Sequence, residues 1–458
     1  MITKSYYNIS ERKVLLRLVD ILLIIIGLFL SSHYFDFNYF SFSNDFIFRW
    51  ILLLIFYYLI FGQIFMLYNL TTSNNRYTVF RSINLTAYFT TIFYVFTPFI
   101  SPQLPLNRLQ IVCLFLILSL PGILWRFLYI WFFFSTKYSK NIFFIGKSEK
   151  IKNLLIKVND DNIHNVKGYL SDKKLDNVAN FHEFSGTQLS SIIKNNISEI
   201  IVSLNGFPSE IKRNLNRELI LLFSQGINIV SYEAFYEDIM YRVPIENLKK
   251  SFYKYLNFSK NSHNRFYLLS LRLLDIILSV IGLIILFSLV PFLFFVNLFA
   301  NKGPLFYSQQ RVGKMGKVFK IYKLRSMVVN AESNGAVWAK KNDKRITNFG
   351  RLLRSTRCDE LPQFYNILRR DMSIIGPRPE RPEFVKELTE TIPFYKIRHL
   401  IRPGLTGWAQ VKYPYANSVK EQEMKLLYDL YYIKQRNIIL DFKIIIKTIT
   451  TVLFYRGQ

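Results

Sequence analysis

The sequence predicts a membrane protein built from three parts: a bundle of four transmembrane α-helices, a doubly wound α/β domain in the cytoplasm, and an α-rich monotopic C-terminal domain with a re-entrant membrane helix. Two observations predict this class. Apolar stretches long enough to span a bilayer fill residues 1–135, and another lies at 273–299. Residues 136–250 instead alternate short apolar and amphipathic stretches, and residues 300–458 carry 30 Lys and Arg against 13 Asp and Glu.

The overall composition limits the class of protein further. The chain has 458 residues, 59 Lys and Arg against 31 Asp and Glu, and a formal net charge of +28. It is also 51% hydrophobic and 17% aromatic, which is too apolar for a disordered chain or one that only coats nucleic acid. The two cysteines, Cys113 and Cys358, are too few for a disulfide framework or a metal cluster.

The N-terminal part, residues 1–135, is predicted to cross the membrane four times. The predicted spans are 14–32, 46–68, 83–101 and 109–134. Basic residues flank the N-terminus and the end of the fourth span, whereas the loop at 33–45 has no Lys or Arg, so the N-terminus and everything after 135 face the cytoplasm. Arg126 lies inside the fourth span and is expected to face a neighbouring helix or to snorkel.

Residues 136–250 are predicted to form a Rossmann-like α/β domain. Strands are expected at 141–146, 165–170 and 198–204, with helices at 148–158 and within 184–197, and this alternation is typical of a doubly wound sheet. The turn after the first strand is "IGKSEK", with one glycine where a dinucleotide-binding turn has three. The turn therefore argues against a nicotinamide cofactor and favours a non-catalytic regulatory or oligomerising domain.

Residues 251–299 combine a basic linker with the fifth apolar stretch. The flanks of this stretch, 249–272 and 300–327, together carry 13 Lys and Arg and no acidic residue, so both are expected on the cytoplasmic side. A helix that enters the membrane, bends and returns satisfies both flanks, and Pro291 with nearby Ser288 supplies a cause for the bend. The alternative is an ordinary fifth span that exports the C-terminal domain.

The basic residues of 300–458 stand in motifs punctuated by glycine and proline. These motifs are "QQRVGKMGKVFKIYKLRSM", "GRLLRSTRCDE", "RRDMSIIGPRPERPE" and "IRPGLTGWAQV". Nucleic acid, anionic lipid headgroups and a phosphorylated substrate are all candidate partners for such a domain. Rigid turns that hold Arg and Lys in place favour a site for oxyanions. The final stretch, 438–455, is either an interfacial amphipathic helix or a core helix.

The stretch "RCDELPQFYNIL" (357–368) places two carboxylates, Asp359 and Glu360, directly before a proline. An apolar stripe at Leu361, Phe364, Tyr365 and Leu368 predicts a helix that begins there. The N-terminus of a helix stabilises a carboxylate and binds a phosphate equally well. The pair is therefore either part of a phosphate-handling site or simply two acids that stabilise a surface helix.

Several separate motifs in order identify a family resemblance. The run of "GPLFYSQQRVGKMGKVFKIYKLRSM", "TNFGRLLRSTRCDELPQFYNIL", "DMSIIGPRPE", "RPGLTGWAQV" and "LYDLYYI" strongly resembles the bacterial polyprenyl-phosphate sugar-1-phosphate transferases. The resemblance is dense over 265–458 and looser over the whole chain, as in the large members that begin exopolysaccharide, capsule or O-antigen synthesis. It implies transfer of a sugar phosphate from a UDP-sugar to undecaprenyl phosphate at the cytoplasmic membrane, with release of UMP, and no nucleic-acid partner.

The resemblance also implies roles for particular residues. Asp359 matches the nucleophile that forms a phosphosugar-aspartate intermediate, and Glu360 matches its partner, which would bind Mg²⁺ with the substrate phosphates. Four basic side chains are candidates for binding phosphate: Arg354, Arg378, Lys323 and Arg325. The last two are weaker candidates, because a basic patch beside a membrane also contacts lipid.

The sequence departs from the family pattern at the membrane break, before the dyad and in "IKQRNIILDF" (433–442), which matches only in outline, and two other functions remain open. The membrane break is usually an adjacent Ser-Pro, but Leu289 and Val290 separate Ser288 from Pro291, and Cys358 replaces the more usual leucine before the dyad. A membrane-anchored sugar-nucleotide dehydratase would need a glycine-rich cofactor turn, which "IGKSEK" does not provide. A non-catalytic regulator of polysaccharide assembly would not require the Asp-Glu pair.

Overall fold

A computed structural model describes residues 9–453 of the chain, apart from a set of internal gaps. These gaps are 35–36, 38, 41, 43, 69–75, 98–99, 134–139, 160–163, 176–179, 184–188, 190–196, 245–263, 330, 332–342, 344 and 414–417. The chain divides into two compact units, residues 1–235 and 236–458, and each is described by itself.

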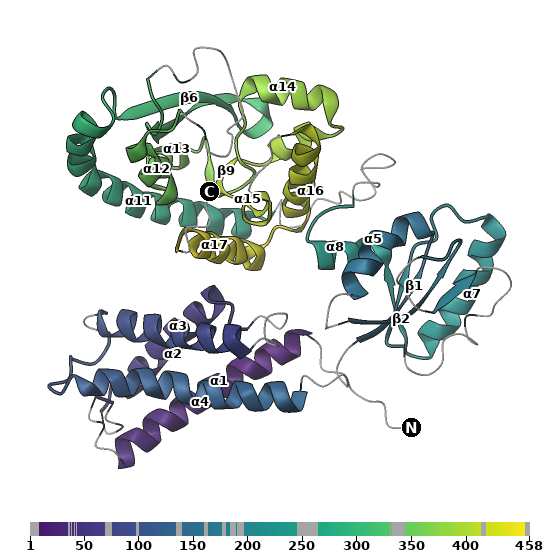
Figure 1. The fold of residues 1–458 in the computed structure, drawn as a ribbon, viewed down its shortest axis with the longest axis horizontal. Coiled ribbons are helices and arrows are strands. Elements are labelled where there is room, and N and C mark those ends of the chain that lie inside the picture. Colours follow the sequence, from purple (N-terminus) through teal and green to yellow (C-terminus); the bar gives the residue numbers. More distant parts are fainter. Residues whose placement is uncertain are drawn as a thin grey trace. The chain divides into compact units, whose positions relative to one another are not determined.

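Four helices form the N-terminal bundle: α1 (Ile9–Tyr34), α2 (Ile47–Ile64), α3 (Arg76–Val95) and α4 (Leu109–Phe133). In the bundle α1 packs on α4, α3 packs on both α2 and α4, and Figure 1 shows all four. The core is apolar and aromatic, with Leu16, Leu54, Tyr94 and Leu114 fully buried. Apolar residues at helical spacing on the opposite faces, such as Leu18 and Leu22, are exposed, as expected for helices that contact lipid.

Among the described residues, four helices are long and apolar enough to cross a membrane, but they are not the predicted four. Three of them, α1, α2 and α4, match predicted spans, and the fourth is α11 (Arg265–Ala300). The predicted third span, 83–101, is a helix with different bounds, because α3 begins at Arg76 and ends at Val95. The polar residues of α3, including buried Thr86, Thr90 and Thr91, keep it below the apolarity of a span.

The charged residue inside the fourth span does face a neighbouring helix, as predicted. The Nη2 atom of Arg126 donates to the Oδ2 atom of Asp20 on α1 at 2.7 Å, and both side chains are buried. The guanidinium also lies over the ring of Tyr68. Because an unpaired charge is costly in hydrocarbon, the pair fixes how α1 and α4 are rotated against each other.

The α/β part of the first unit contains a five-stranded sheet in the order β3-β2-β1-β4-β5, with every pair parallel. The strands are β1 (Lys140–Ile145), β2 (His164–Ser171), β3 (Phe181–Glu183), β4 (Glu199–Val202) and β5 (Asn228–Ser231). The accompanying helices are α5 (Ser148–Asn159), α7 (Ser209–Ser224) and α8 (Tyr232–Met240). The parallel sheet and its first three elements agree with the sequence; the helix predicted within 184–197 lies almost entirely outside the described residues.

Successive side chains of β1 point to opposite faces of the sheet. Phe143 and Ile145 pack in one core with Leu219 of α7, whereas Phe144 contacts the ring of Phe235 on α8. Helices therefore cover parts of both faces (Figure 1), and the doubly wound connection of the whole sheet stays a prediction.

The turn after β1 lies where a dinucleotide-binding fold holds a phosphate, and here a carboxylate of the protein contacts the start of α5. The N–H of Ser148, at the start of α5, donates to the Oδ1 atom of Asp172 at 2.7 Å. A carboxylate of the protein thus satisfies this helix N-terminus, and Ile151 fills the space beside Gly146.

The second unit contains a helical domain with two small sheets. Its long helices are α11, α14 (Pro382–Thr391), α16 (Val419–Gln435) and α17 (Ile438–Leu453), and its shorter ones are α12 (Asn348–Ser355), α13 (Gln363–Leu368) and α15 (Trp408–Lys412). The strands β6 (Phe306–Val312) and β7 (Val318–Leu324) form an antiparallel hairpin, and β8 (Ser373–Ile375) pairs in parallel with β9 (Gly404–Thr406). The domain is helix-rich as predicted, but the hairpin was not predicted.

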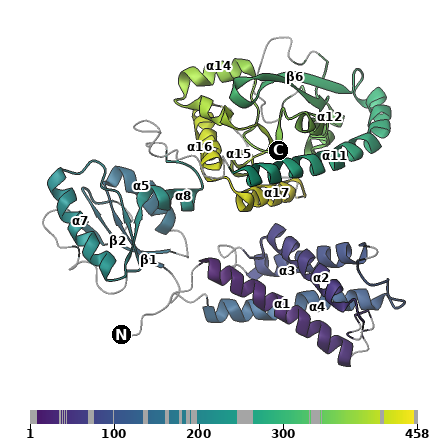
Figure 2. The same ribbon diagram turned by 180° about the vertical axis from the view of Figure 1, so that it is seen from behind.

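The helix α11 continues through Pro291 without a break. Figures 1 and 2 show it running beneath α12 and turning at its C-terminal end toward β6. Pro291 cannot donate to the carbonyl of Phe287, one turn before it. The hydroxyl of Ser288 donates instead to the carbonyl of Ile284 at 2.9 Å, a bond that favours bending but does not satisfy the freed carbonyl.

The last helix, α17, combines the two alternatives that the sequence left open. Leu440, Asp441 and Ile444 are buried in the domain, whereas Ile439 and Phe442 are exposed. One face of α17 is therefore a core face and the other is an apolar surface.

Candidate active site

The carboxylate pair lies in a tight 3₁₀ turn, Cys358–Glu360, between α12 and α13. Arg357 enters the turn in the left-handed region with a φ of 60°. Before the turn, the hydroxyl of Thr347 caps α12 by accepting from the N–H of Gly350. A side chain at Gly350 would collide with the carbonyl of Ser326, so glycine allows α12 to approach the end of β7 closely. The dyad thus lies just before a helix, as predicted, and is itself part of a 3₁₀ turn.

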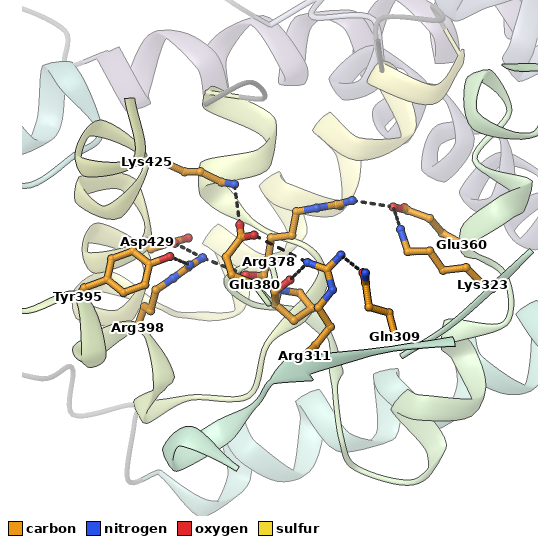
Figure 3. A network of polar contacts seen from close by, with 11 residues as sticks. Gln309, Arg311, Lys323, Glu360, Arg378, Glu380, Tyr395, Arg398, Lys425 and Asp429 are labelled. Carbon is orange, nitrogen blue, oxygen red and sulfur yellow. Dashed lines mark hydrogen bonds and ion pairs between the residues drawn. The ribbon is translucent and has the colours of Figure 1, made fainter. Parts of the chain in front are cut away.

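Glu360 is buried and surrounded by three cationic side chains. Its Oε1 atom lies 3.2 Å from Nη2 of Arg378 and 3.7 Å from Nζ of Lys323, and its Oε2 atom lies 3.3 Å from Nη1 of Arg357. Figure 3 shows Lys323 and Arg378 converging on the carboxylate. Burial raises the pKa of Glu360, but Arg378, Lys323 and Arg357 outweigh it and hold the pKa at about 2. Glu360 is therefore ionised throughout the neutral range.

Asp359 differs from its neighbour. Its side chain is buried, and within the described part of the chain no hydrogen bond or ion pair engages its carboxylate. Burial raises its pKa most; Glu360 also raises it, whereas Lys323, Arg354 and Arg378 lower it. The carboxylate of Glu360 is thus paired with cations, whereas the carboxylate of Asp359 lies beside them without a partner among the described residues.

The predicted phosphate-binding residues fall into two groups. Lys323, Arg354 and Arg378 surround the dyad, and Nε of Arg354 donates to the hydroxyl of Ser326 at 2.8 Å. Arg325 lies elsewhere: it is buried, and its guanidinium donates to the carbonyls of Pro304, Asn301 and Met327. These contacts tie the C-terminal end of α11 to β7, so they favour a structural role for Arg325, and we assign it no phosphate.

The position of Arg378 depends on a second ionic network, which sequence reasoning missed. Glu380 lies 3.2 Å from Nζ of Lys425 and 3.8 Å from Nη1 of Arg311. Burial raises the pKa of Glu380, but Lys425, Arg398 and Arg311 hold it at about 2. Arg398 forms an ion pair with Asp429 at 2.9 Å and donates to the carbonyl of Arg378 (Figure 3). Arg311 and Glu380 both stand in quoted motifs, but nothing in the sequence pairs them across 69 positions.

The inner face of α13 is also different from the predicted one. Gln363, Asn366 and Ile367 are buried, whereas Tyr365, which belongs to the predicted apolar stripe, is exposed. Asn366 explains the polar face, because its Nδ2 donates to the carbonyl of Lys320 and its Oδ1 accepts from the N–H of Tyr322. The helix is thereby joined to β7, and this joint brings Lys323 opposite the dyad.

The residues present fit a magnesium ion that arrives with a phosphorylated substrate. Among the described residues, no three His, Cys, Asp or Glu side chains form a cluster that could hold a metal by itself. Mg²⁺ in phosphate-handling sites needs only one or two carboxylates and takes its other ligands from phosphate and water. Asp359 and Glu360 provide that number.

The geometry supports chemistry on a phosphate ester. A buried, unbonded carboxylate can act as a nucleophile when nearby cations offset its repulsion of an anionic substrate. Lys323, Arg354 and Arg378 supply that positive charge.

Known proteins with similar sequences are named as enzymes that act on phosphorylated substrates. Residues 266–455 match the family model described as bacterial sugar transferase. An Aeromonas hydrophila protein named UDP-N-acetylgalactosamine-undecaprenyl-phosphate N-acetylgalactosaminephosphotransferase is 48% identical over 153 residues, covering 33% of this chain and 36% of the relative. A Klebsiella pneumoniae protein named UDP-glucose:undecaprenyl-phosphate glucose-1-phosphate transferase is 39% identical over 180 residues, covering 39% of each chain. The matches thus span less than half of these two relatives.

A shorter relative is covered more fully. A Bacillus subtilis protein named for undecaprenyl-phosphate N-acetylgalactosaminyl 1-phosphate transfer is 48% identical over 132 residues, which cover 29% of this chain and 74% of the relative. Residues 266–455, which match the family model, contain the dyad, the cations around it and the ionic network behind Arg378. The chain therefore belongs to the bacterial sugar transferase family, which includes undecaprenyl-phosphate sugar phosphotransferases.

Proposed function

We propose that the protein transfers a sugar-1-phosphate from a UDP-sugar to undecaprenyl phosphate and releases UMP, as the first membrane step of surface polysaccharide synthesis. The observation that carries this proposal is the contrast within the dyad: Glu360 is held by three cations, whereas Asp359 is buried beside them and unbonded among the described residues. The substrates are those for which the relatives are named. A panel of UDP-sugars assayed with undecaprenyl phosphate identifies the sugar.

The first step is a displacement at the phosphorus next to the sugar. An oxygen of the Asp359 carboxylate forms a bond to that phosphorus, the bond to the bridging oxygen of the diphosphate breaks, and UMP leaves with that electron pair. The product on the enzyme is a phosphosugar-aspartate. Arg354 and Arg378 lie where they can neutralise the phosphate as the anionic carboxylate approaches, which is the main obstacle to this attack.

The second step returns the carboxylate. A phosphate oxygen of undecaprenyl phosphate attacks the same phosphorus, the bond to Asp359 breaks, and undecaprenyl diphosphate-sugar is released. Dividing the transfer in this way means that the two anionic substrates never have to meet in the site at the same moment. Throughout both steps Glu360 keeps Lys323 and Arg378 in position next to the reacting phosphate.

The dyad assignment predicts different effects for its two members. Asp359→Asn should abolish UMP release, because an amide oxygen is too weak a nucleophile, and Glu360→Gln should lower it by about a hundredfold or more, because Lys323 and Arg378 lose their anchor. Glu383→Gln, at an exposed position of α14, is the matched control and should keep wild-type activity. Near-wild-type UMP release by purified Asp359→Asn would show that Asp359 is not the nucleophile.

The raised pKa of Asp359 predicts a pH effect that can be assigned to one neighbour. Asp359 must be ionised to attack, so the rate should fall as the pH drops through a pKa that lies above the ordinary value of 3.8. Arg354 lowers this pKa, so Arg354→Gln should move the acid limb of the rate profile to higher pH. Arg351→Gln, at an exposed position on the same helix, should leave the midpoint unchanged. A midpoint that stays in place or moves to lower pH in Arg354→Gln contradicts the assignment.

Magnesium is part of the proposal. The carboxylate of Glu360 or Asp359 would hold Mg²⁺ when it binds with the substrate, and the ion would supply positive charge that neutralises the leaving UMP. Activity should therefore disappear in excess EDTA and return on addition of Mg²⁺. Full UMP release in excess EDTA would remove the metal from the mechanism.

We infer a re-entrant arrangement from the contacts of α11, and a cytoplasmic side from its basic flanks. Near its N-terminal end Arg272 donates to the carbonyls of Ile367 and Leu368, and near its C-terminal end Asn301 donates to the carbonyl of Arg325. These two ends therefore contact the same domain, which a helix that exports this domain across a bilayer core of about 30 Å could not do. Its outward side chains, such as Ile277, are exposed and apolar, as lipid contact requires.

The re-entrant arrangement predicts the same side for both flanks of α11. In a background without Cys113 and Cys358, we expect a membrane-impermeant thiol reagent added to intact cells or spheroplasts to label neither Ser262→Cys nor Ser308→Cys. Both should be labelled after the membrane is permeabilised, which controls for accessibility. Labelling of Ser308→Cys alone in intact cells would show a true fifth span.

A further inference from the structure

A small hollow lies directly behind the cations that hold Glu360. Its volume is about 10 Å³, which is roughly the space of one water molecule or one phosphate oxygen. Four polar side chains line it: Arg311, Lys323, Gln363 and Arg378. Lys323 and Arg378 are the same side chains that contact Oε1 of Glu360, so the hollow adjoins the dyad.

The guanidinium of Arg311 is fixed at its two terminal nitrogens. Nη1 donates to the carbonyl of Pro379 at 3.1 Å, and Nη2 donates to Oε1 of Gln309 at 2.8 Å (Figure 3). The remaining donor, Nε, is buried and has no hydrogen-bond partner among the residues that the structure describes. A fixed guanidinium with an unused buried donor is costly unless that donor is satisfied in some state of the protein.

Gln363 presents a second unused donor. Its side chain is only 3% exposed, and its Nε2 atom is buried without a hydrogen-bond partner in the described part of the chain. The residue follows the dyad by three positions, in the first turn of α13, and nothing in the reaction described above uses it. A buried, unpartnered amide in the wall of a catalytic site calls for an explanation, because such groups are nearly always hydrogen-bonded.

We propose that this hollow is a subsite for one non-bridging oxygen of the substrate diphosphate, which accepts hydrogen bonds from Gln363 and Arg311. The inference rests on the proposed function for the identity of the diphosphate. The unpartnered atoms are both donors, and the cations Lys323 and Arg378 line the same hollow, so an anionic oxygen fits better than a group that must also donate. Gln363 and Arg311 are then binding residues for the nucleotide phosphate and not only structural ones.

The test measures binding, so that it does not depend on turnover. The dissociation constants of UDP and of inorganic phosphate would be measured by calorimetry on the full chain in nanodiscs, in an Asp359→Asn background. Gln363→Met keeps the size of the side chain and removes the donor; it should weaken UDP binding about tenfold. Gln363→Glu should weaken it more, because a carboxylate repels the incoming oxygen.

The matched control is Gln410→Met. Gln410 also has a buried Nε2 atom for which the described residues provide no hydrogen-bond partner, but it does not line the hollow. This variant should bind UDP like its parent, and a thermal-unfolding midpoint within experimental error of the parent shows that each variant is folded.

The outcomes separate the subsite from the proposed function. Weaker binding of both UDP and phosphate in the two Gln363 variants supports the subsite. Unchanged UDP binding in Gln363→Met, or tighter binding in Gln363→Glu, overturns the subsite while leaving the transfer reaction in place. If the parent protein binds phosphate but not UDP, the nucleotide substrate itself is wrong. If it binds neither, both proposals fall.

Discussion

The second unit depends on one electrostatic constraint: two adjacent carboxylates are buried together. Burial and mutual repulsion both raise the pKa of such a pair, and without compensation one of the two would be protonated. Lys323, Arg357 and Arg378 remove this conflict at Glu360, whose pKa falls to about 2. Asp359 benefits from the same cations without bonding to them, so it keeps a reactive carboxylate within a positive site.

The rest of the domain can be understood as the support of those cations. Lys323 comes from a strand that Asn366 joins to α13, and Arg378 comes from a loop held by a network that contains the acids Glu380 and Asp429. Both of these acids are paired with cations, because an uncompensated charge in this interior would cost several kcal/mol. The cations Lys323 and Arg378 are thus held in place, whereas the carboxylate of Asp359 has no bonding partner among the described residues.

In the proposed mechanism, α11 is the helix that attaches the second unit to the membrane. This helix contacts the domain near both of its ends and presents an apolar outer side, and α17 adds a second exposed apolar face. A site mounted on such helices would lie at the membrane surface. The reaction proposed above would then need neither the nucleotide sugar nor the lipid phosphate to be moved across the bilayer.

The sequence alone determined the features that are local or periodic. Apolar stretches located three of the bundle helices and α11, strand–helix alternation located the parallel sheet, and the motif around Asp359 located the site. It did not determine which charges meet. Asp20 and Arg126 are 106 positions apart, and Lys425 and Glu380 are 45 apart, so only folding brings them together. The tertiary structure also shows that Arg325 bonds to backbone carbonyls and that α13 buries Gln363 and Asn366. The sequence could not determine these features, because pairing and burial depend on what packs against a side chain and not on its neighbours in the chain.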